Sequence, residues 1–353
     1  MEQYDGITLF SGGLDSLLTA RLLMEQGLAI KCLHFHSPFF GSPGRVEHWR
    51  KTYGLDIDAV DVGPEYVEML KAGPTHGFGS AMNPCVDCKI LMMRRTKELM
   101  QGYGASFIAS GEVLGQRPMS QRRDTLNIIL RDAGVRGLLL RPLCALLLDP
   151  TQAELSGLVD RSRLLGFNGR GRKDQLDLAR KFGISEIPTP GGGCKLTEKE
   201  NTRRFWPVLR RIGDPAVDDF RLADIGRQFW HGGCWLSIGR HQQDNEAYAG
   251  VLRPGDLLFK VAGFPGPLAV GRLGRDWSGE DVRDAAALVA SYSPKACRSA
   301  QEGTPVPVNA TLEGRTVRIE VVPSRETPFR EPSWEDARDE LYALRKPGKS
   351  GGD

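Results

Sequence analysis

The sequence predicts an α/β protein, with a parallel-sheet, Rossmann-like domain followed by a smaller α+β domain. Two observations support this prediction. The first half alternates short apolar runs with helical patterns, which is typical of strand–helix–strand units in a mostly parallel sheet. Beyond about residue 205, apolar runs follow one another as antiparallel strands do. A length of 353 residues also suits about two domains.

The composition is that of a folded globular chain. Hydrophobic residues make up 40% and charged residues 26%, and no apolar run reaches the ~18 residues that a membrane helix requires. The first residues show no basic region or cleavage site, so we expect a cytoplasmic protein without a membrane partner. Seven cysteines favour metal or thiol chemistry over a disulfide framework. A net charge of +3 does not by itself indicate a polyanionic partner.

The apolar periodicity of each segment predicts the elements of the first domain. Turn residues separate these segments, and helices follow strands throughout. The predicted strands are 7–10, 28–35, 57–62, 106–110 and 138–143, and the predicted helices are 14–26, 45–53, 66–71, 86–100 and 151–165.

The second domain is predicted to contain strands that pair with their neighbours along the chain. These strands are 235–239, 256–261, 268–273, 306–312 and 316–322, with helices at 244–252 and 278–292 and a short helix at 334–344. We therefore divide the chain into a first domain (1–204), a second domain (205–327), and a short helix with a frayed tail (328–353).

A glycine-rich turn follows the first predicted strand. Residues 11–16 read Ser-Gly-Gly-Leu-Asp-Ser, and a helix then begins. Backbone N–H groups of such a turn converge on an anion and the helix N-terminus adds positive potential, so the turn suits a phosphate. A carboxylate beside phosphate requires a cation, so we expect Asp15 to face Mg²⁺. The alternative is an ordinary tight turn in which Asp15 and Ser16 cap the helix.

This turn resembles the PP-loop of ATP pyrophosphatases, whose SGGxDS pattern it matches in full. The resemblance implies an adenine nucleotide alpha hydrolase-like domain that splits ATP between the α and β phosphates and adenylates an acceptor. Residues 110–121 look like the SGExxGQxxSQ region of the 4-thiouridine synthetase and its relatives, and they also follow a strand, so the two segments should meet. The expected ATP and pyrophosphate ligands are Ser11, Gly12, Gly13, Leu14, Asp15, Ser16, Gly111, Glu112 and Gln116.

Three of the cysteines lie in motifs. Cys85 and Cys88 form a CxxC at the start of a predicted helix, and Cys194 follows a run of glycines at 191–193. Thiolates at a helix N-terminus have lowered pKa values, and a third cysteine on a glycine turn can close on the same site. The others are expected to pack in the interior; they are Cys32, Cys144, Cys234 and Cys297.

Three hypotheses for the role of Cys85, Cys88 and Cys194 stay open. A structural zinc site would need a fourth ligand, for which His34 or His76 is available. A persulfide mechanism would use Cys85 and Cys194, as in the 2-thiouridine synthetases that the NPCxxC segment resembles. The full set of three also resembles that of sulfurtransferases in which three thiolates hold a 4Fe-4S cluster and one iron stays open for hydrosulfide. We favour the cluster hypothesis.

Basic residues suggest an RNA partner. The segment 161–181 is rich in arginine and lysine, and residues 169–173 form a glycine-rich basic loop. Residues 235–246, 256–260 and 292–296 resemble the RNA-binding domain of the NFACT family. The candidate RNA contacts are Arg170, Arg172, Lys173, Arg240, Asn245, Lys295 and Arg298.

These features together predict an ATP-dependent tRNA sulfurtransferase that adenylates a uridine carbonyl and replaces its oxygen with sulfur. The catalytic residues would be Asp15, Cys85, Cys88 and Cys194, with ATP, Mg²⁺ and a 4Fe-4S cluster as cofactors. The partners would be tRNA and either inorganic sulfide or a sulfur-donor protein, and homodimerisation is left open. The alternatives are a cluster-free, persulfide-based tRNA thiouridylase and a non-catalytic RNA-binding factor.

Overall fold

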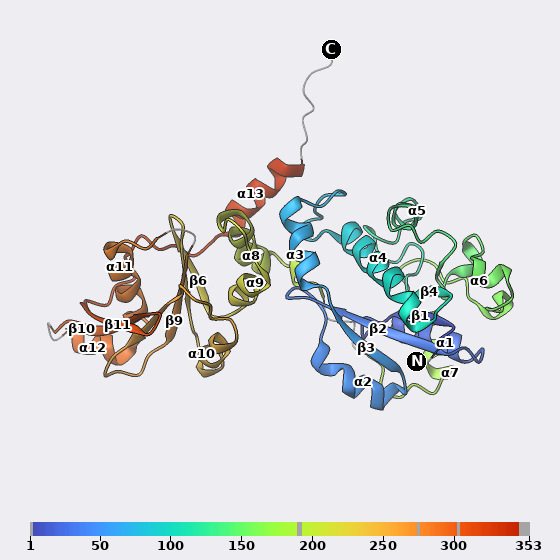
Figure 1. The fold of residues 1–353 in the computed structure, drawn as a ribbon, viewed down its shortest axis with the longest axis horizontal. Coiled ribbons are helices and arrows are strands. Elements are labelled where there is room, and N and C mark those ends of the chain that lie inside the picture. The colour runs from blue at the N-terminus through green and yellow to red at the C-terminus, as the bar shows by residue number, and fades with distance from the viewer. Residues whose placement is uncertain (1–2, 189–192, 274–275, 302–303, 346–353) are drawn as a thin grey trace, which may run out of the picture. The chain divides into compact units, whose positions relative to one another are not determined.

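The chain forms two compact units, Met1–Thr197 and Glu198–Asp353 (Figure 1). The computed structural model describes residues 3–188, 193–273, 276–301 and 304–345. Two of the glycines before Cys194, at 191 and 192, and the predicted frayed tail after residue 345 lie outside this range. No helix in the described ranges is long and apolar enough to cross a membrane.

The first unit is built on a parallel sheet with strand order β3-β2-β1-β4-β5, which confirms the predicted fold class. Alternate side chains of a strand point to opposite faces. Accordingly, Ile108 of β4 lies in one buried cluster with residues of α4 and α5, while Phe107 and Ala109 lie in another with residues of α1, α2 and α7. The strands are β1 (Gly6–Leu9), β2 (Ile30–His36), β3 (Asp56–Asp61), β4 (Phe107–Ser110) and β5 (Leu139–Leu140). The helices are α1 (Leu14–Met24), α2 (Val46–Tyr53), α3 (Gly63–Ala72), α4 (Cys85–Tyr103), α5 (Arg123–Asp132), α6 (Gln152–Leu155) and α7 (Lys173–Lys181).

The predicted helix 151–165 is wrong. The chain is helical only over Gln152–Leu155, because Gly157 adopts a positive φ of 77° that ends the helical path. A separate 3₁₀ turn then forms at Arg161–Arg163, where the Asp160 side chain accepts a hydrogen bond from the Ser162 N–H. Helices α5 and α7 are not among the predicted elements, and α7 lies in the basic segment 161–181.

The second unit contains a six-stranded antiparallel sheet with the order β11-β10-β8-β9-β7-β6. Helix α11 packs on this sheet, and alanines of α11 lie in its buried cluster. Its strands are β6 (Arg227–His231), β7 (Cys234–Ile238), β8 (Leu257–Val261), β9 (Leu268–Leu273), β10 (Val306–Leu312) and β11 (Arg315–Val321). Its helices are α8 (Lys199–Arg211), α9 (Val217–Asp224), α10 (Gln242–Ala247), α11 (Gly279–Ala290), α12 (Pro294–Gln301) and α13 (Trp334–Arg345).

The first unit ends at Thr197, seven residues before the predicted boundary. Helix α8 begins just after it, at Lys199. Helix α8 packs against α9 and α13, and Trp206 Nε1 donates a hydrogen bond to Glu340 Oε2 (2.8 Å). The C-terminal helix therefore belongs to the second unit. At one edge of its sheet, Trp230 of β6 exchanges two backbone hydrogen bonds with Arg330, whereas β11 forms the other edge.

Candidate nucleotide and thiol site

The segment 11–16 connects β1 to α1, as the sequence predicts. Gly13 is the N-cap residue of α1 and no side-chain hydrogen bond caps the helix, so the alternative in which Asp15 and Ser16 cap it is wrong. Ser16 Oγ donates to the Gly13 carbonyl (2.8 Å) and accepts from the Ser11 N–H (3.2 Å), which closes the turn. The uncapped N–H groups at the start of α1 are therefore available to an anion.

The segment 110–121 lies directly against this turn. Ser110 pairs with Leu9 in the parallel strands β4 and β1, so the two loops leave the same edge of the sheet. A Cβ on Gly111 would lie 2.6 Å from the backbone carbon and oxygen of Asp15. Gln116 Nε2 donates a hydrogen bond to Asp15 Oδ2 (3.2 Å). The structure thus brings together the two segments that the sequence assigned to ATP and pyrophosphate.

Positive charges surround Asp15. Burial raises the pKa of Asp15, while the hydrogen bond from Gln116 and the positive charges of Arg172 and Arg117 oppose this shift. The two guanidinium groups therefore lie close enough to act on the carboxylate. Arg172 is one of the predicted RNA contacts and Arg117 is not a predicted site residue, because nothing in the sequence shows that their loops fold against the phosphate loop.

The basic loop at 169–173 reaches this site through backbone contacts. The Gly169 N–H donates to the Leu114 carbonyl (2.8 Å), and Asn168 pairs with Leu114 in an isolated bridge. Helix α7 then begins at Lys173 and packs on α1. Arg170 and Lys173 are exposed on this loop, whereas Arg172 is half-buried.

A buried ion pair supports the segment 110–121. Arg141 Nε donates to Glu112 Oε2 (3.0 Å), and both side chains are 2% exposed. Ser110 Oγ also donates to Glu112 Oε2 (3.1 Å), and Lys89 Nζ lies 3.8 Å from Glu112 Oε1. Burial acts to raise the pKa of Glu112, but the charges of Arg141 and Lys89 outweigh it and lower the pKa. Glu112 is thus held as a carboxylate.

Several buried polar atoms around the two loops have no hydrogen-bond partner in the described structure. Buried polar groups are nearly always paired, so a group of orphans at one place indicates a site for a polar ligand. Four belong to residues of 110–121 or to Arg141, which supports that segment, and the other two belong to Asp15 and Arg172. They are Asp15 Oδ1, Glu112 Oε1, Gln116 Oε1, Gln121 Oε1, Arg141 Nη2 and Arg172 Nε. The free Asp15 Oδ1 suits the oxygen ligand that Mg²⁺ requires.

The CxxC motif lies on the first turn of α4. Asn83 Nδ2 donates to Cys85 Sγ (3.1 Å), and burial raises the pKa of Cys88 to about 11. Between them, the Asp87 carboxylate accepts hydrogen bonds from the N–H groups of Thr75 (3.0 Å) and His76 (2.9 Å). These bonds tie the preceding loop to the helix start.

Tyr66 of α3 lies near all three motif cysteines. The Lys195 N–H donates to the Phe39 carbonyl (2.9 Å), and the Phe39 ring lies 5.4 Å from the Tyr66 ring. Tyr66 is fully buried, and its pKa is raised by burial and by the neighbouring Cys88, Cys194 and Cys85 thiols. All three motif thiols therefore lie within electrostatic range of one phenol, and Tyr66 is not a predicted site residue because it lies in no motif.

The three motif cysteines supply thiolate donors of the kind that a metal ion or an iron–sulfur cluster takes. In the described ranges, no three His, Cys, Asp or Glu side chains gather closely enough to hold one ion. A single zinc ion needs its sulfurs close together, at bonds of about 2.3 Å. Thiolates are donors both for zinc and for iron–sulfur clusters, and none of the three motif cysteines forms a disulfide in the described structure.

The two histidines considered as a fourth zinc ligand are engaged elsewhere. The His34 ring bonds to the Phe10 carbonyl (2.9 Å) and accepts from the Ser42 N–H (2.8 Å), and burial lowers its pKa. His76 Nε2 lies 3.0 Å from Asp132 Oδ2. Of the cysteines outside the motifs, three are fully buried as expected and Cys297 is half-buried; the three are Cys32, Cys144 and Cys234.

The predicted RNA residues of the second unit divide into two kinds. Lys295 and Arg298 are exposed on α12. Arg240 Nε binds Asp244 Oδ2 (3.1 Å), and Asn245 Oδ1 accepts a hydrogen bond from the Leu268 N–H (3.1 Å). Asn245 therefore supports the strand β9, and its amide oxygen is not free for RNA.

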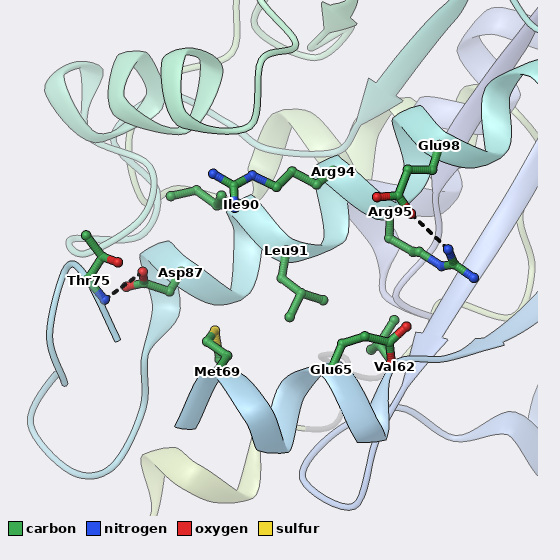
Figure 2. Close-up of a pocket in the computed structure, with 10 residues that line it drawn as sticks. All are labelled: Val62, Glu65, Met69, Thr75, Asp87, Ile90, Leu91, Arg94, Arg95 and Glu98. Carbon is green, nitrogen blue, oxygen red and sulfur yellow. Dashed lines mark hydrogen bonds and ion pairs between the residues drawn. The ribbon is translucent and has the colours of Figure 1, made fainter. Parts of the chain in front are cut away.

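A separate cavity lies between α3 and α4. Its volume is about 290 Å³, and Figure 2 shows Met69 of α3 and Leu91 of α4 pointing into it. Arg95 and Glu98 form an ion pair at one side (2.8 Å). None of the predicted site residues lines this cavity, so we do not assign the chemistry to it.

Comparisons with known proteins support the resemblance on the first unit. Residues 1–149 match the family model described as thiamine biosynthesis protein (ThiI). A probable tRNA sulfurtransferase of Streptococcus gordonii is 30% identical over 118 residues, covering 31% of this chain and 28% of the relative. One of Thermococcus kodakarensis is 28% identical over 213 residues, covering 58% and 48%. The chain thus spans less than half the length of these relatives.

Among solved structures, a predicted subunit of tRNA methyltransferase from Methanocaldococcus jannaschii is 18% identical with a TM-score of 0.32, covering 50% of this chain and 75% of that one. A score this low supports no argument about function. The part of the chain that carries the two loops is thus similar to the ThiI family model and to probable tRNA sulfurtransferases. The resemblance of the second unit to the NFACT domain stays a prediction.

Proposed function

We propose that the chain is an ATP-dependent tRNA sulfurtransferase that converts a uridine to thiouridine. One observation carries this proposal: the nucleotide loops and the CxxC motif are joined through Lys89. Lys89 follows Cys88 on α4, and its ammonium lies 3.8 Å from Glu112, which follows the glycine packed on Asp15. A phosphate-binding turn and a group of thiols so connected suit one reaction that needs both.

In the first step, ATP would adenylate a uridine carbonyl oxygen and release pyrophosphate. The N–H groups of the 11–16 turn would bind the pyrophosphate, and Arg172 and Arg117 would add positive charge where it departs. Asp15 would hold Mg²⁺, which neutralises phosphate charge when bound. The orphaned oxygens and nitrogens of the two loops would then gain partners.

In the second step, sulfide would attack the adenylated carbon, and AMP would leave with the original oxygen. Cys85, Cys88 and Cys194 would hold the 4Fe-4S cluster, which when bound supplies an open iron for sulfide. Tyr66 would position the thiols, and Lys89 would place a positive charge between them and the nucleotide loops. The tRNA substrate follows from the names of the relatives, and the 110–121 segment favours C4 as the modified carbon.

The decisive test is thiouridine formation by the purified chain. Anaerobic protein, unmodified tRNA, MgATP and sulfide should yield thiouridine on nucleoside mass spectrometry, and the protein should be brown with about four irons per chain. Absence of thiouridine together with absence of ATP–pyrophosphate exchange would reject the proposal in favour of a non-catalytic RNA-binding factor.

Single cysteine variants distinguish the cluster from a persulfide. Serine at Cys85, Cys88 or Cys194 should remove the iron and the colour, whereas serine at Cys144 or Cys297 should leave both. A persulfide mechanism predicts instead that Cys88→Ser stays active. Stoichiometric zinc without iron would reject both mechanisms.

A further inference from the structure

Two arginines of the second unit share one aromatic ring. The Arg227 guanidinium lies 4.8 Å from the centre of the Tyr292 ring, and the Arg325 guanidinium lies 4.6 Å from it. Arg227 belongs to β6, Tyr292 follows α11, and Arg325 lies beyond β11. Three segments distant in sequence thus place two positive charges on a single phenol.

These two guanidiniums lack the carboxylates that other arginines of this unit have. Arg318 binds Glu320 and Arg221 binds Asp218, each at 3.0 Å. Neither Arg227 nor Arg325 makes an ion pair with any residue in the described ranges. Two like charges on one ring repel each other, and Glu331, whose charge acts on Tyr292, is paired with Arg203, so an anionic partner would stabilise the arrangement.

A hollow adjoins the cluster. Its volume is about 620 Å³, and Phe229, Arg325 and Thr327 are among the residues that line it. The Phe229 ring lies 6.2 Å from the Tyr292 ring. Thr327 is 5% exposed, and its hydroxyl has no partner in the described structure. Glu331 also lines the hollow but lies 3.6 Å from Arg203.

We propose that Arg227, Tyr292 and Arg325 bind an unpaired nucleotide of RNA, with its base stacked on the cluster and its phosphate on the guanidiniums. Unstacked bases bind to aromatic rings and to arginine planes, and guanidinium pairs with phosphate oxygens. The hollow provides room for the base, and the Thr327 hydroxyl provides a polar contact. This inference rests on the proposed function for its RNA ligand, and it places that ligand at residues outside the seven selected from the sequence.

The test is binding of the full chain to a fluorescent uridine hexanucleotide and to a tRNA transcript over a range of salt concentrations. Arg227→Gln and Arg325→Gln should each weaken binding and lower the slope of log affinity against log salt by about 0.7 for the hexanucleotide. Tyr292→Leu should weaken hexanucleotide binding between about fivefold and a hundredfold without changing this slope, since stacking is not ionic. Tyr292→Phe should bind like the wild type.

Arg315→Gln is the matched control, because it removes an exposed arginine at the opposite edge of the same sheet. It should leave the affinity and slope unchanged. Wild-type binding by the Arg227→Gln/Arg325→Gln variant, with an unchanged melting temperature, would overturn the inference. Equal competition by hexaglutamate would also overturn it, in favour of an acidic peptide. If this double variant binds normally while the wild type forms thiouridine, only this inference fails; if the wild type neither binds tRNA nor forms thiouridine, the proposed function fails as well.

Discussion

Asp15 is half-buried at the start of α1, and its Oδ1 atom has no hydrogen-bond partner in the described structure. Its raised pKa means that the ionised form costs stability above that pKa in the folded chain without a cation. Asp15→Asn should therefore unfold at the same free energy as the wild type or a higher one at pH 7. ATP–pyrophosphate exchange should fall at least about tenfold, or about 1.4 kcal/mol, because the charge facing Mg²⁺ is lost.

The matched control for this variant is Asp177→Asn on α7, which removes an exposed carboxylate of the same unit. Its exchange rate and melting temperature should stay at wild-type values. Full activity of Asp15→Asn would remove Asp15 from the site.

Gly111 tests the close approach of the two loops. Because an added Cβ would lie 2.6 Å from Asp15 backbone atoms, Gly111→Ala must push the loops apart. We expect a loss of about 1–3 kcal/mol in the free energy of unfolding and a larger loss of exchange activity. Thermal melts and exchange assays measure these effects. Gly171→Ala, where no atom lies within 4 Å, should show neither; equal behaviour of both variants would contradict the proposed packing.

The sequence predicts those site residues that lie in a motif. It does not predict residues that only the fold places beside a motif. The 11–16 and 110–121 segments are recognisable because their residues are contiguous. Tyr66 and Arg117 are not, since their importance comes from neighbours on other elements. The charge of Arg172 predicts an anionic partner, but charge alone does not show which anion it faces, and in the structure it acts on Asp15.

Between elements, the Glu112–Arg141 pair joins the loop after β4 to the segment after β5. Arg141→Met would leave a buried carboxylate without its main partner, so we expect a loss of about 3–5 kcal/mol in the free energy of unfolding. The double variant Glu112→Gln/Arg141→Met should lose less free energy of unfolding than the sum of the losses of the two single variants. Chemical denaturation of the four proteins measures this coupling, and strict additivity would contradict it.

The same pair predicts how stability depends on pH. The folded pKa of Glu112 lies below its ordinary value of 4.5, so its contribution is fully present above that pH. It is lost as pH falls through the folded pKa. Glu112→Gln should therefore flatten the acid limb of the stability curve below about pH 4.5, as followed by melting temperature. An unchanged acid limb would show that Glu112 does not titrate with folding.

The elements that the sequence predicts correctly have clear periodicity and clear ends. The strands of the parallel sheet are short apolar runs, and α4 has a long periodic pattern. Helix α7 is not predicted because arginines and lysines make its segment look like a charged loop. Strand β6 is not predicted because it is short and lies between Gly226 and Gly232, which have positive φ. The predicted helix 151–165 is wrong because the positive φ of Gly157 ends the helix despite the apolar pattern that continues beyond it.

For the whole molecule, the two units predict a division of labour. All phosphate-loop and motif cysteine residues lie before Glu198. A chain ending at Thr197 should keep ATP binding, measured by calorimetry, and lose affinity for tRNA. The salt slope of tRNA binding should also become shallower by up to about 0.9 for each lost phosphate contact. Unchanged affinity and slope would place RNA binding on the first unit, where Arg170 and Lys173 are exposed.

The two edges of the antiparallel sheet have different consequences for self-association. The β6 edge is covered, because its Trp230 already pairs with Arg330. The β11 edge is uncovered in the described structure and exposes Arg315, Arg318 and Val317. Unpaired strand edges invite pairing with a second chain, and charged side chains discourage it. Replacing Arg315 and Arg318 by valine would remove these charges and allow the edge to pair with a second chain. The two arginines therefore protect concentrated protein from aggregation.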